Sequence, residues 1–597
     1  MKVKTPIDIP ARSAKPSAPA SGDMRLSVDS AGAMYLQDST GNEMAIRQGV
    51  YINHIGEPGK RGFGQGICPS DVIAKANAIY GFSKIVSLNG TFDINSANYG
   101  NYQIVDDESI MVWIPFFWQK KNADNTGDVK YEGYFADEAA ANAAGYSVPR
   151  GFIDGGVIQR GIFIDKYKPS LTGIYSGDLN INGSNIDKGC ASSIKGGNPI
   201  SSSAESLRKR DGEMDNHYAG SFSNCYQYNS DAPPENNYSG AIRAARSRGL
   251  IFHCVTIFSG ELIRLLTHVH KQAAIGTLHC AWNDIAPAEP RGNNNYGVDY
   301  YDSGVIYAPC DDFYWGNKTS PMEARKNGGG TPFAKTTHNG QDCGICIDCN
   351  QWEFQPGVTA KVESAQAIVS ITRATQVVVT VTDAAATNSN YANGKPVMIL
   401  GSLTGEWATL LKNKFFTISD ISGNTFKIKD KDGNYVNSAA LSAAYSSGLT
   451  STTGKFYILS EYTKMTDVTG GNTLGTDLWG ATGINAMYEE IDVDFNGPVG
   501  GQYGNGSNQV FSGEVNRTTN AYKLSAAGLP MNRLSYGSGT AIMGSDYCYS
   551  YLVNELAPLA FGAWNYGPYA GVGARYWGDF RAFSNRGVSF RCGLFIG

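Results

Sequence analysis

The segment 574–597, ARYWGDFRAFSNRGVSFRCGLFIG, is unusually dense in aromatic and arginine side chains. Disordered segments are poor in aromatic residues, because without a core they cannot bury the rings. We therefore expect this segment to be folded, with its large side chains either in a core or on a contact surface. The rest of the chain decides between these two possibilities.

The composition favours strands and ordered loops over helical bundles. The 597 residues include 71 Gly and 34 Tyr, and only 17% are charged. A net charge of -5 without a basic stripe argues against a nucleic-acid partner. The opening residues lack the apolar core of a signal peptide, and GLIFHCVTIF is too short to span a bilayer. We expect a soluble protein, made in a cytoplasm, without membrane insertion.

A compact α+β domain is predicted after the N-terminal regions. The segments 108–119 and 160–170 are apolar and predict buried strands. A helix is predicted over 239–249, and a stronger one over 258–274. In the stronger helix, apolar residues recur at helical spacing, namely Leu262, Leu265, Leu266 and Val269.

The stretch 361–455 differs from the sequence on either side of it in composition and in the spacing of its apolar runs. It contains short strands rich in Val, Ile, Thr and Phe at regular spacing, separated by Gly and Asn turns. This pattern predicts a small all-β module inserted into the main domain. Near the N-terminus, MRLSVDSAGAMYLQ predicts two alternating strands joined through SAG.

Five regions are predicted along the chain. They are an N-terminal attachment hairpin region (1–50), a connecting region (51–104), the first part of the main domain (105–360), the inserted β module (361–455) and the second part of the main domain (456–597).

An ordered series of segments resembles the C-type-lectin-like fold of the formylglycine-generating, or sulfatase-modifying-factor, family. IFIDKYKPS resembles an early strand of that family, and AIRAARSRGLIFHCVTIFSGELIRLL resembles its helix, strand and second helix. GICIDCNQWEF resembles the GNVWEW signature, and RGVSFRCG resembles the closing GFRC. The matches cover roughly 110–360 and 456–597, and they imply a C-type-lectin-like main domain.

The C-terminal segment also resembles phage tail proteins and the variable proteins of diversity-generating retroelements. Ala563 and Ser589 replace two glycines of that pattern. The residues at the places of the pattern are Gly562 to Trp564, Ala570, Gly571 and Ser589 to Arg591. The inserted module resembles small β repeats of phage tail proteins, and the N-terminal hairpin resembles the opening of tail-fibre proteins.

These resemblances imply a phage tail adhesin located in the virion. The N-terminus would attach to other tail proteins, and the lectin-like domain would bind a bacterial surface glycan or protein non-covalently. A homotrimer is the family expectation. The identity of the receptor and diversification by a retroelement stay open. The alternatives are a structural baseplate or tail-decoration protein and an enzyme of the formylglycine or sulfoxide-synthase branch.

The enzyme branch lacks its expected residues here. Its formylglycine-generating members bind copper through two cysteines just before the closing motif, whereas ARYWGDFRAFSNRG contains none. The sulfoxide synthases need a histidine triad, but His268 and His270 lie two apart and so face different sides of the predicted helix. We expect no enzymatic activity.

One cysteine cluster raises the question of a metal. Cys343, Cys346 and Cys349 could begin a zinc or iron–sulfur site, with His338 as the nearest fourth ligand. Buried free thiols are the interpretation that we favour, so no cofactor is expected. Trp-Asn-Asp within 281–287 also occurs in calcium-dependent lectins, but at another place in the domain. Oxygen-rich loops leave a structural calcium open.

A recognition face is predicted on the C-terminal segment. Trp, Tyr and Arg are the residues that most often anchor interfaces, and Asn and Asp add adaptable hydrogen bonds. Trp564, Phe583, Phe590 and Cys592 are expected in the core. The predicted receptor-binding residues are Asn565, Tyr566, Tyr569, Arg575, Tyr576, Trp577, Asp579, Phe580, Asn585 and Arg586.

Overall fold

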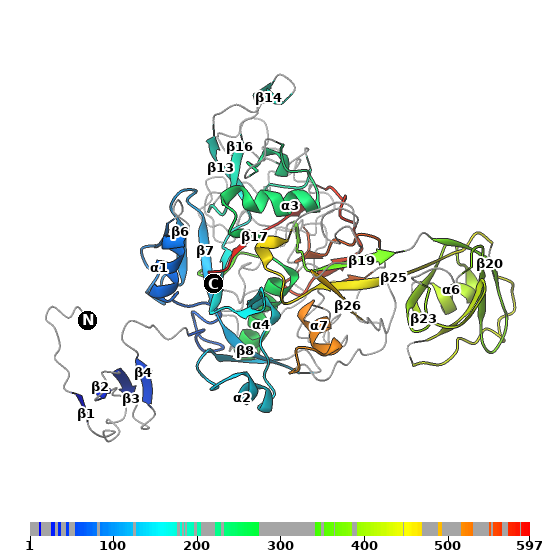
Figure 1. Ribbon diagram of the computed structural model, residues 1–597, viewed down its shortest axis with the longest axis horizontal. Coiled ribbons are helices and arrows are strands. Elements are labelled where there is room, and N and C mark those ends of the chain that lie inside the picture. Colours follow the sequence, from blue (N-terminus) through cyan, green and yellow to red (C-terminus); the bar gives the residue numbers. More distant parts are fainter. Residues whose placement is uncertain are drawn as a thin grey trace, which may run out of the picture.

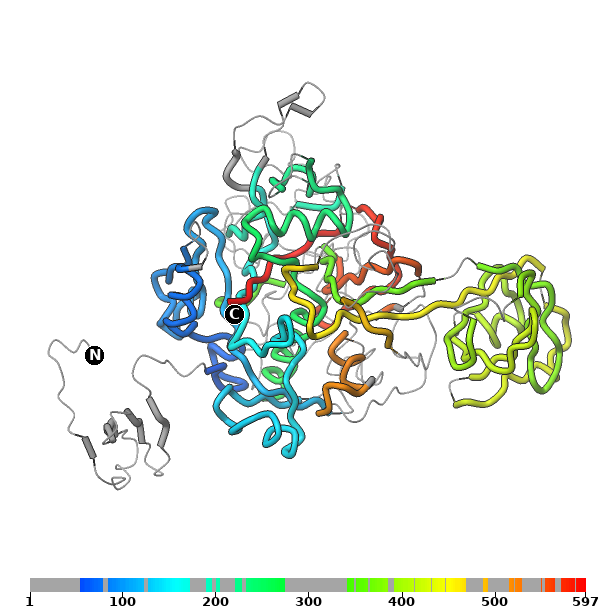
Figure 2. Tube along the Cα trace, viewed as in Figure 1, coloured from blue at the N-terminus to red at the C-terminus, as the bar shows by residue number. Residues whose placement is uncertain are grey.

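The structure of the protein is a computed structural model (Figures 1 and 2). It describes residues 11–12, 25–29, 34–37, 43–46, 54–79, 84–122, 127–175, 180–181, 184–185, 188–195, 200–203, 221–227, 232–273, 341–347, 351–362, 365–384, 391–412, 414–430, 432–445, 447–468, 487–491, 515–528, 548–550, 553–563, 571–585 and 587–596.

A six-stranded antiparallel sheet forms the centre of the main domain. Its strand order is β17-β31-β12-β7-β6-β5. The bounds are Phe252–Cys254 (β17), Cys592–Leu594 (β31), Gly161–Asp165 (β12), Ile110–Pro115 (β7), Asn101–Ile104 (β6) and Ile85–Ser87 (β5). The strand nearest the C-terminus, β31, therefore lies between β12 and β17, and both neighbours come from early parts of the chain. Cys592 of β31 and Phe590, two residues before it, are fully buried, as predicted.

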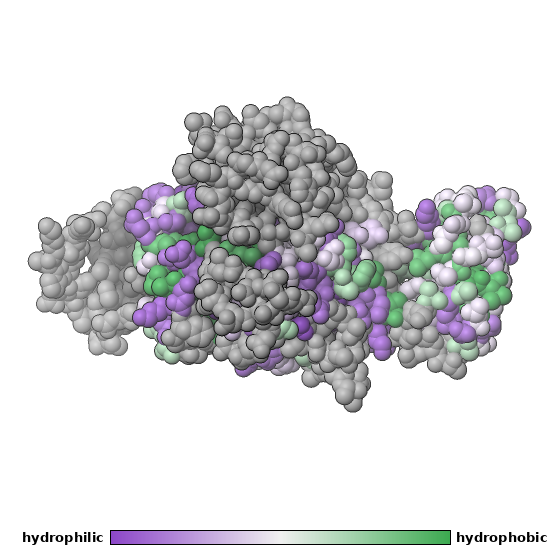
Figure 3. Space-filling model, turned by 90° about the horizontal axis from the view of Figure 1, so that it is seen from above, coloured by the Kyte–Doolittle hydropathy of each residue, from purple (hydrophilic) through white to green (hydrophobic). Residues whose placement is uncertain are grey.

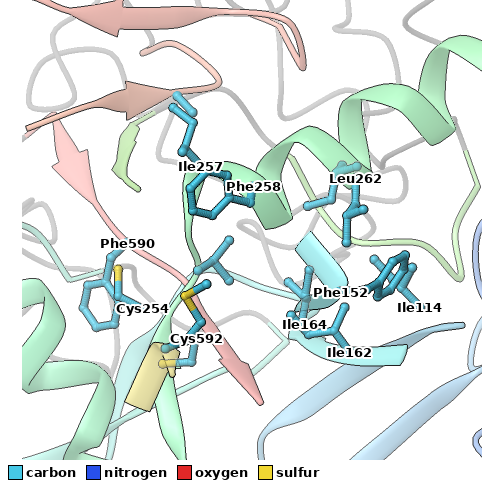
Figure 4. Close-up of a cluster of buried hydrophobic side chains, with 14 of the residues drawn as sticks. Ile114, Phe152, Ile162, Ile164, Cys254, Ile257, Phe258, Leu262, Phe590 and Cys592 are labelled. Carbon is cyan, nitrogen blue, oxygen red and sulfur yellow. The ribbon is translucent and has the colours of Figure 1, made fainter. Parts of the chain in front are cut away.

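The predicted helices are confirmed. Helix α3 spans Tyr238–Ala245 and continues as a 3-10 turn to Arg248, and Gly249 ends it with a φ of 128°. Helix α4 spans Ile257–Ala273, and its four periodic apolar residues are all buried. Figure 4 shows Phe258 and Leu262 of α4 beside Phe152 of the 3-10 helix η1 (Arg150–Phe152) and above the isoleucines of β12. The first part of the chain therefore packs helix on sheet around one core.

Further short elements surround this core. They are α1 (Ser70–Ile79), β8 (Phe117–Lys121), β9 (Gly127–Tyr131), α2 (Glu138–Ala143), β10 (Ile153–Asp154), β11 (Val157–Ile158), β13 (Ser170–Tyr175), β14 (Asn180–Ile181), β15 (Ser184–Asn185), β16 (Lys188–Ser192), η2 (Phe222–Asn224), η7 (Met465–Asp467) and α7 (Asn520–Ala526).

A second, five-stranded sheet joins the two parts of the main domain. Its order is β27-β29-β28-β18-β30. The bounds are Cys548–Ser550 (β27), Arg575–Trp577 (β29), Leu559–Ala560 (β28), Trp352–Phe354 (β18) and Val588–Ser589 (β30). Strand β18 comes from before the inserted module and pairs with β28 and β30 from after it. Pairing across the insertion is what unites the main domain.

The inserted module, which lies in sequence between the two parts of the main domain, is a small closed barrel with a hydrophobic core of its own. Its strands are β20 (Gln366–Ile371), β21 (Val378–Val381), β24 (Thr425–Lys429), β23 (Phe415–Ser422) and β22 (Pro396–Leu400), and the ring closes through β25 (Thr450–Leu459). Helix α6 (Gly405–Leu411) buries Trp407 and Leu411 in a hydrophobic cluster separate from that of the main domain. Figures 1 and 3 show the module as a lobe of its own, with hydrophobic and hydrophilic residues interspersed over the visible surface.

Strand β25 belongs to both cores. Residues 450–453 pair with β20 and β22 in the module, whereas 454–459 pair with β19 (Val358–Val362) and β26 (Tyr488–Ile491) in the main domain. The module is therefore attached through a continuous β ladder. Whether it can be removed without loss of the fold stays a prediction.

The N-terminal region contains more strands than the two predicted. Strands β2 (Arg25–Asp29), β3 (Met34–Gln37) and β4 (Glu43–Ile46) form an antiparallel meander, and β1 (Ala11–Arg12) adds a parallel strand beside β2. The predicted hairpin is the pair β2 and β3. Among the residues that the structure describes, strands outnumber helices, and this mixed content is compatible with the predicted α+β class. Within the described segments, no helix combines the length and the apolar character needed to cross a bilayer.

Candidate functional site

The predicted recognition segment lies across the five-stranded sheet. In β29, Tyr576 pairs with Leu559 of β28 on one side and with Tyr549 of β27 on the other. The sheet thus places a ring from β27 next to a ring from β29. Figure 2 shows the C-terminal trace, drawn in red, running from the edge of the main body into its centre.

Three aromatic rings meet at this sheet. Tyr549 and Tyr576 are stacked, with ring centroids 4.9 Å apart and planes 10° apart, and Trp352 lies 5.8 Å from Tyr576. Gly578 allows this arrangement, because a Cβ atom there would lie 2.7 Å from the ring of Tyr549 and 2.9 Å from that of Tyr576. Both tyrosines are half-buried, so part of each ring faces solvent.

Asp579 comes three residues after Tyr576 in the sequence, next to Gly578. Burial raises the pKa of its carboxyl to about 7, far above its ordinary value. Burial also raises the pKa of Tyr549, and the nearby charge of Asp579 adds to that effect. The site therefore combines half-buried phenol rings with a carboxyl that changes charge near neutral pH.

The segment beyond Asp579 presents a further ring. Phe580 is 47% exposed, and its ring contacts Phe583 edge-on at 6.4 Å. Phe583 is half-buried against the main core, as predicted. Asn585 is exposed, and its side-chain oxygen accepts a hydrogen bond from the Gly587 amide at 2.6 Å. Asn585 thus helps to shape the loop as well as lying on its surface.

Two predicted receptor-binding residues are buried, so the prediction was wrong for them. Arg575 is 0% exposed and Trp577 is 1% exposed. Side chains alternate between the two faces of a strand, so both point away from the face that carries Tyr576. Arg575 lies 3.7 Å from Glu261 of α4, and Trp577 lies 6.4 Å from the ring of Phe456. They contribute to the core rather than to a recognition face.

Four of the predicted site residues and one predicted core residue lie outside the described residues. They are Asn565, Tyr566, Tyr569 and Arg586, and the core residue Trp564.

Sequence reasoning missed how deeply the other C-terminal arginines are buried. Arg591 is 0% exposed and forms an ion pair with Glu353, with its Nη2 2.8 Å from Oε1. Its guanidinium also donates to the carbonyl oxygens of Asp165, Lys166 and Cys346. The two motifs that carried the family resemblance, WEF and FRC, are therefore bonded to each other. A charged residue in both motifs was the signal that could have predicted this pair.

The cysteine cluster differs from the prediction. Cys346 is in a disulfide, so it is neither a free thiol nor a thiolate ligand. Cys343 is a buried free thiol, as favoured, and burial raises its pKa. Cys349 and His338 lie outside the described residues, as does the Trp-Asn-Asp segment. The described segments contain no group of three or more potential metal-ligating side chains.

A pair of thiols that the sequence did not suggest lies in the core. Cys254 of β17 is directly opposite Cys592 of β31, and both are buried free thiols (Figure 4). Burial raises both pKa values, and each thiol contacts a different carbonyl oxygen, that of Phe354 for Cys254 and that of Ala245 for Cys592. Such protonated thiols are poor nucleophiles and poor metal ligands.

The two histidines of α4 are both buried. His268 lies 3.3 Å from the guanidinium of Arg264, whereas His270 accepts a hydrogen bond from the Gly59 amide and stacks on Phe63. Their different neighbours agree with the prediction that they face different sides of the helix.

Comparison with known proteins adds no family to this description. No protein-family model matches the chain, and no curated protein matches it significantly.

Proposed function

We propose that this protein is a phage tail adhesin whose C-type-lectin-like main domain binds a bacterial surface receptor without covalent chemistry. The N-terminal region would attach it to the other proteins of the tail, within a homotrimer. The sequence resemblance supplies the functional class. The receptor-binding surface would be the exposed part of the C-terminal segment.

One observation carries this proposal. The described part of the C-terminal segment provides Tyr576, which stacks on Tyr549 of β27, a carboxyl at Asp579 with a raised pKa and an exposed ring at Phe580. Rings held by a sheet lose little conformational freedom when a partner binds, so they suit a contact surface. Several copies in one virion would raise the overall affinity without new contacts.

The proposal includes no enzymatic step. The thiol of the closing motif, Cys592, is buried and has a raised pKa, which does not favour oxidative chemistry at that residue.

The adhesin proposal is tested by adsorption of labelled purified protein to a panel of bacterial strains. We expect binding to at least one strain and competition with adsorption of the phage itself. Phe580→Ala should weaken binding, because loss of an interface anchor costs about 2 kcal/mol or more. Tyr134→Ala is the matched control, since Tyr134 is an exposed ring (51%) elsewhere on the domain. Normal adsorption of the Phe580 variant would place the receptor site elsewhere.

A second candidate function, a structural tail component, is favoured by a different surface. Strand β5 is at the edge of the six-stranded sheet, and exposed apolar side chains lie on it and on the chain that follows. They are Val86 (38%), Phe92 (62%), Ile94 (45%) and Val105 (47%). Such side chains at a sheet edge suit contact with a neighbouring protein. Incorporation into virions without binding to any strain would favour this function over adhesion.

A further inference from the structure

The carboxyl of Asp579 has no partner, which is unusual for a half-buried charged group. It accepts no hydrogen bond and joins no ion pair in the described part of the chain. Two other half-buried carboxylates of the main domain, Asp128 and Glu138, contact Lys130 and Arg517 at 2.8 Å and 2.7 Å. Ionisation of a partly buried carboxyl is unfavourable until a cation comes near it, so Asp579 suits a positively charged ligand.

The two arginines nearest to Asp579 in the sequence do not compensate it. Arg575 lies 3.7 Å from the carboxylate of Glu261, and the guanidinium of Arg581 lies 5.3 Å from the ring centroid of Tyr238. Both arginines are fully buried. Burial alone raises the pKa of Asp579, and no charged group contributes to that shift. The carboxyl is therefore free to pair with a cation from outside.

The backbone at Asp579 departs from regular strand pairing. Tyr576 is opposite Leu559, and Phe580 is opposite Leu556. Three residues on one side therefore face two on the other, which makes this place a β-bulge. Asp579 is one of the three, and bulges commonly redirect a side chain next to a functional site.

Aromatic rings lie beside this bulge. Gly578, also in the bulge, is in close contact with the stacked rings of Tyr549 and Tyr576, and the exposed ring of Phe580 follows Asp579 directly. The charge of Asp579 also acts on the Tyr549 phenol and raises its pKa. Because the faces of aromatic rings carry negative potential, a cation near the carboxylate is stabilised by the rings as well.

The rings decide which kind of cation fits best. A primary ammonium group carries three N–H donors, and ring faces are poor acceptors for them. A quaternary ammonium group has no donor to leave unsatisfied, and its methyl groups pack against aromatic faces that attract its charge. One carboxyl beside several rings therefore favours a quaternary ammonium group.

We infer that the C-terminal segment binds a quaternary ammonium group, such as a choline substituent of a bacterial surface polymer, with Asp579 as the counter-ion and Tyr576 and Phe580 against the methyl groups. This inference rests on the proposed receptor binding by the same segment, and it names the chemical group that is recognised.

Choline and its uncharged analogue 3,3-dimethylbutan-1-ol are the probes, titrated into the full-length protein and followed by ligand-observed NMR. We expect choline to bind at least about 10-fold more tightly than the analogue, which has the same shape without the charge. Asp579→Asn should weaken choline binding by about 10-fold or more, and Phe580→Leu by about 3- to 10-fold. Asp383→Asn is the matched control, because Asp383 is an exposed carboxylate of the module, and its binding should equal that of the wild type.

The pH dependence of binding is a readout that a merely structural role of Asp579 would not give. Choline keeps its charge at every pH, and Tyr549 stays protonated because its pKa is raised. The Asp579 carboxyl, with a pKa of about 7, is mostly neutral at about pH 5.5 and mostly ionised at about pH 8.5. Choline binding by the wild type should tighten by about 10-fold or more over this range, whereas that of Asp579→Asn should stay constant.

The inference is overturned if the analogue binds as well as choline, if ethanolamine binds more tightly than choline, or if folded Asp579→Asn protein binds choline like the wild type. Sedimentation of the protein with phosphatidylcholine vesicles would overturn a surface polymer as the source. Adsorption to cells separates this inference from the adhesin proposal. Adsorption that depends on Phe580 without any binding of choline overturns only the inference, whereas choline binding without adsorption to any strain overturns only the adhesin proposal.

Discussion

At the scale of single residues, buried ion pairs join parts of the main domain that are distant in sequence. Arg591 pairs with Glu353, and Arg248 pairs with Asp107 and Asp165 at 2.5 Å and 2.7 Å. All of these side chains are nearly inaccessible to solvent. Such pairs specify one arrangement, because either partner alone would be a buried charge without compensation.

We predict that Arg591→Met destabilises the protein by about 3–5 kcal/mol, because it leaves the Glu353 carboxylate buried without its partner. The measurement is urea-induced unfolding. The double variant Arg591→Met/Glu353→Gln should recover part of this loss. Lys427→Ala is the control, since the Lys427–Asp420 pair is much more exposed and should contribute within about 1 kcal/mol. Equal effects of Arg591→Met and Lys427→Ala would contradict a structural role for the buried pair.

The raised pKa of Asp579 predicts how the stability of the folded protein changes with pH. Its pKa is about 7 in the folded protein, above its ordinary value of 3.8, so the folded state favours the neutral carboxyl. Stability is therefore highest below about pH 4, where the carboxyl is neutral in both states. It falls as pH rises from there through 7, because the unfolded state gives up the proton first. Asp579→Asn cannot ionise and should lose less stability than the wild type between pH 5 and pH 8. The check is the urea midpoint of both proteins at the two pH values, and parallel losses would show that Asp579 ionises freely.

At the scale of elements, strand position decides what a side chain does. Strand β29 has the half-buried Tyr576 on one face, and the fully buried Arg575 and Trp577 on the other. Strand β25 is long enough to complete the module barrel with one half and the main-domain ladder with the other. The pairing of Val362 with Gly454 marks the place where the ladder passes from the main domain to the module.

We predict that the module can be removed at this place. Because Val362 and Gly454 are direct partners on antiparallel strands, replacing 363–453 by Asn-Gly turns β19 and β25 into a hairpin with a two-residue turn. The shortened protein should unfold cooperatively, because the module has a hydrophobic cluster of its own and only Met398 and Phe415, among the described residues of the deleted segment, belong to the buried cluster of the main domain. Thermal unfolding followed by circular dichroism is the measurement. An insoluble product, with a soluble intact protein, would show that the main domain needs the module.

At the scale of the whole molecule, the main domain is assembled from distant parts of the chain. Its central sheet places β31 between β12 and β17, and its second sheet pairs β18 with strands that follow the module. The disulfide at Cys346 lies near this junction, since the Cys346 carbonyl accepts a hydrogen bond from Arg591. Covalent closure there restricts the unfolded chain.

We predict that a reductant lowers the melting temperature and that a chelator does not. Loss of a disulfide typically costs about 2–5 kcal/mol, whereas EDTA removes only a metal. Parallel melts in dithiothreitol and in EDTA are the measurement, and elemental analysis of the untreated protein is the control. A stoichiometric metal whose removal unfolds the protein would contradict the prediction.

The sequence by itself determined the elements whose pattern is local. The spacing of Leu262, Leu265, Leu266 and Val269 predicted α4, and Gly249 predicted the end of the preceding helix, because helical periodicity and capping depend on neighbours in sequence. The short runs rich in Val, Ile, Thr and Phe at regular spacing in 361–455 likewise predicted the strands of the module. The density of rings and arginines in 574–597 correctly indicated a folded segment.

Only the tertiary structure decided which side of each element is covered. Strand alternation separates Tyr576 from Arg575 and Trp577, but the partners that bury the latter two, Glu261 and Phe456, come from more than 100 residues away in sequence. The same holds for the Arg591–Glu353 pair, whose members are also more than 100 residues apart. Burial and ion pairing depend on packing between distant segments, and no local pattern specifies that packing.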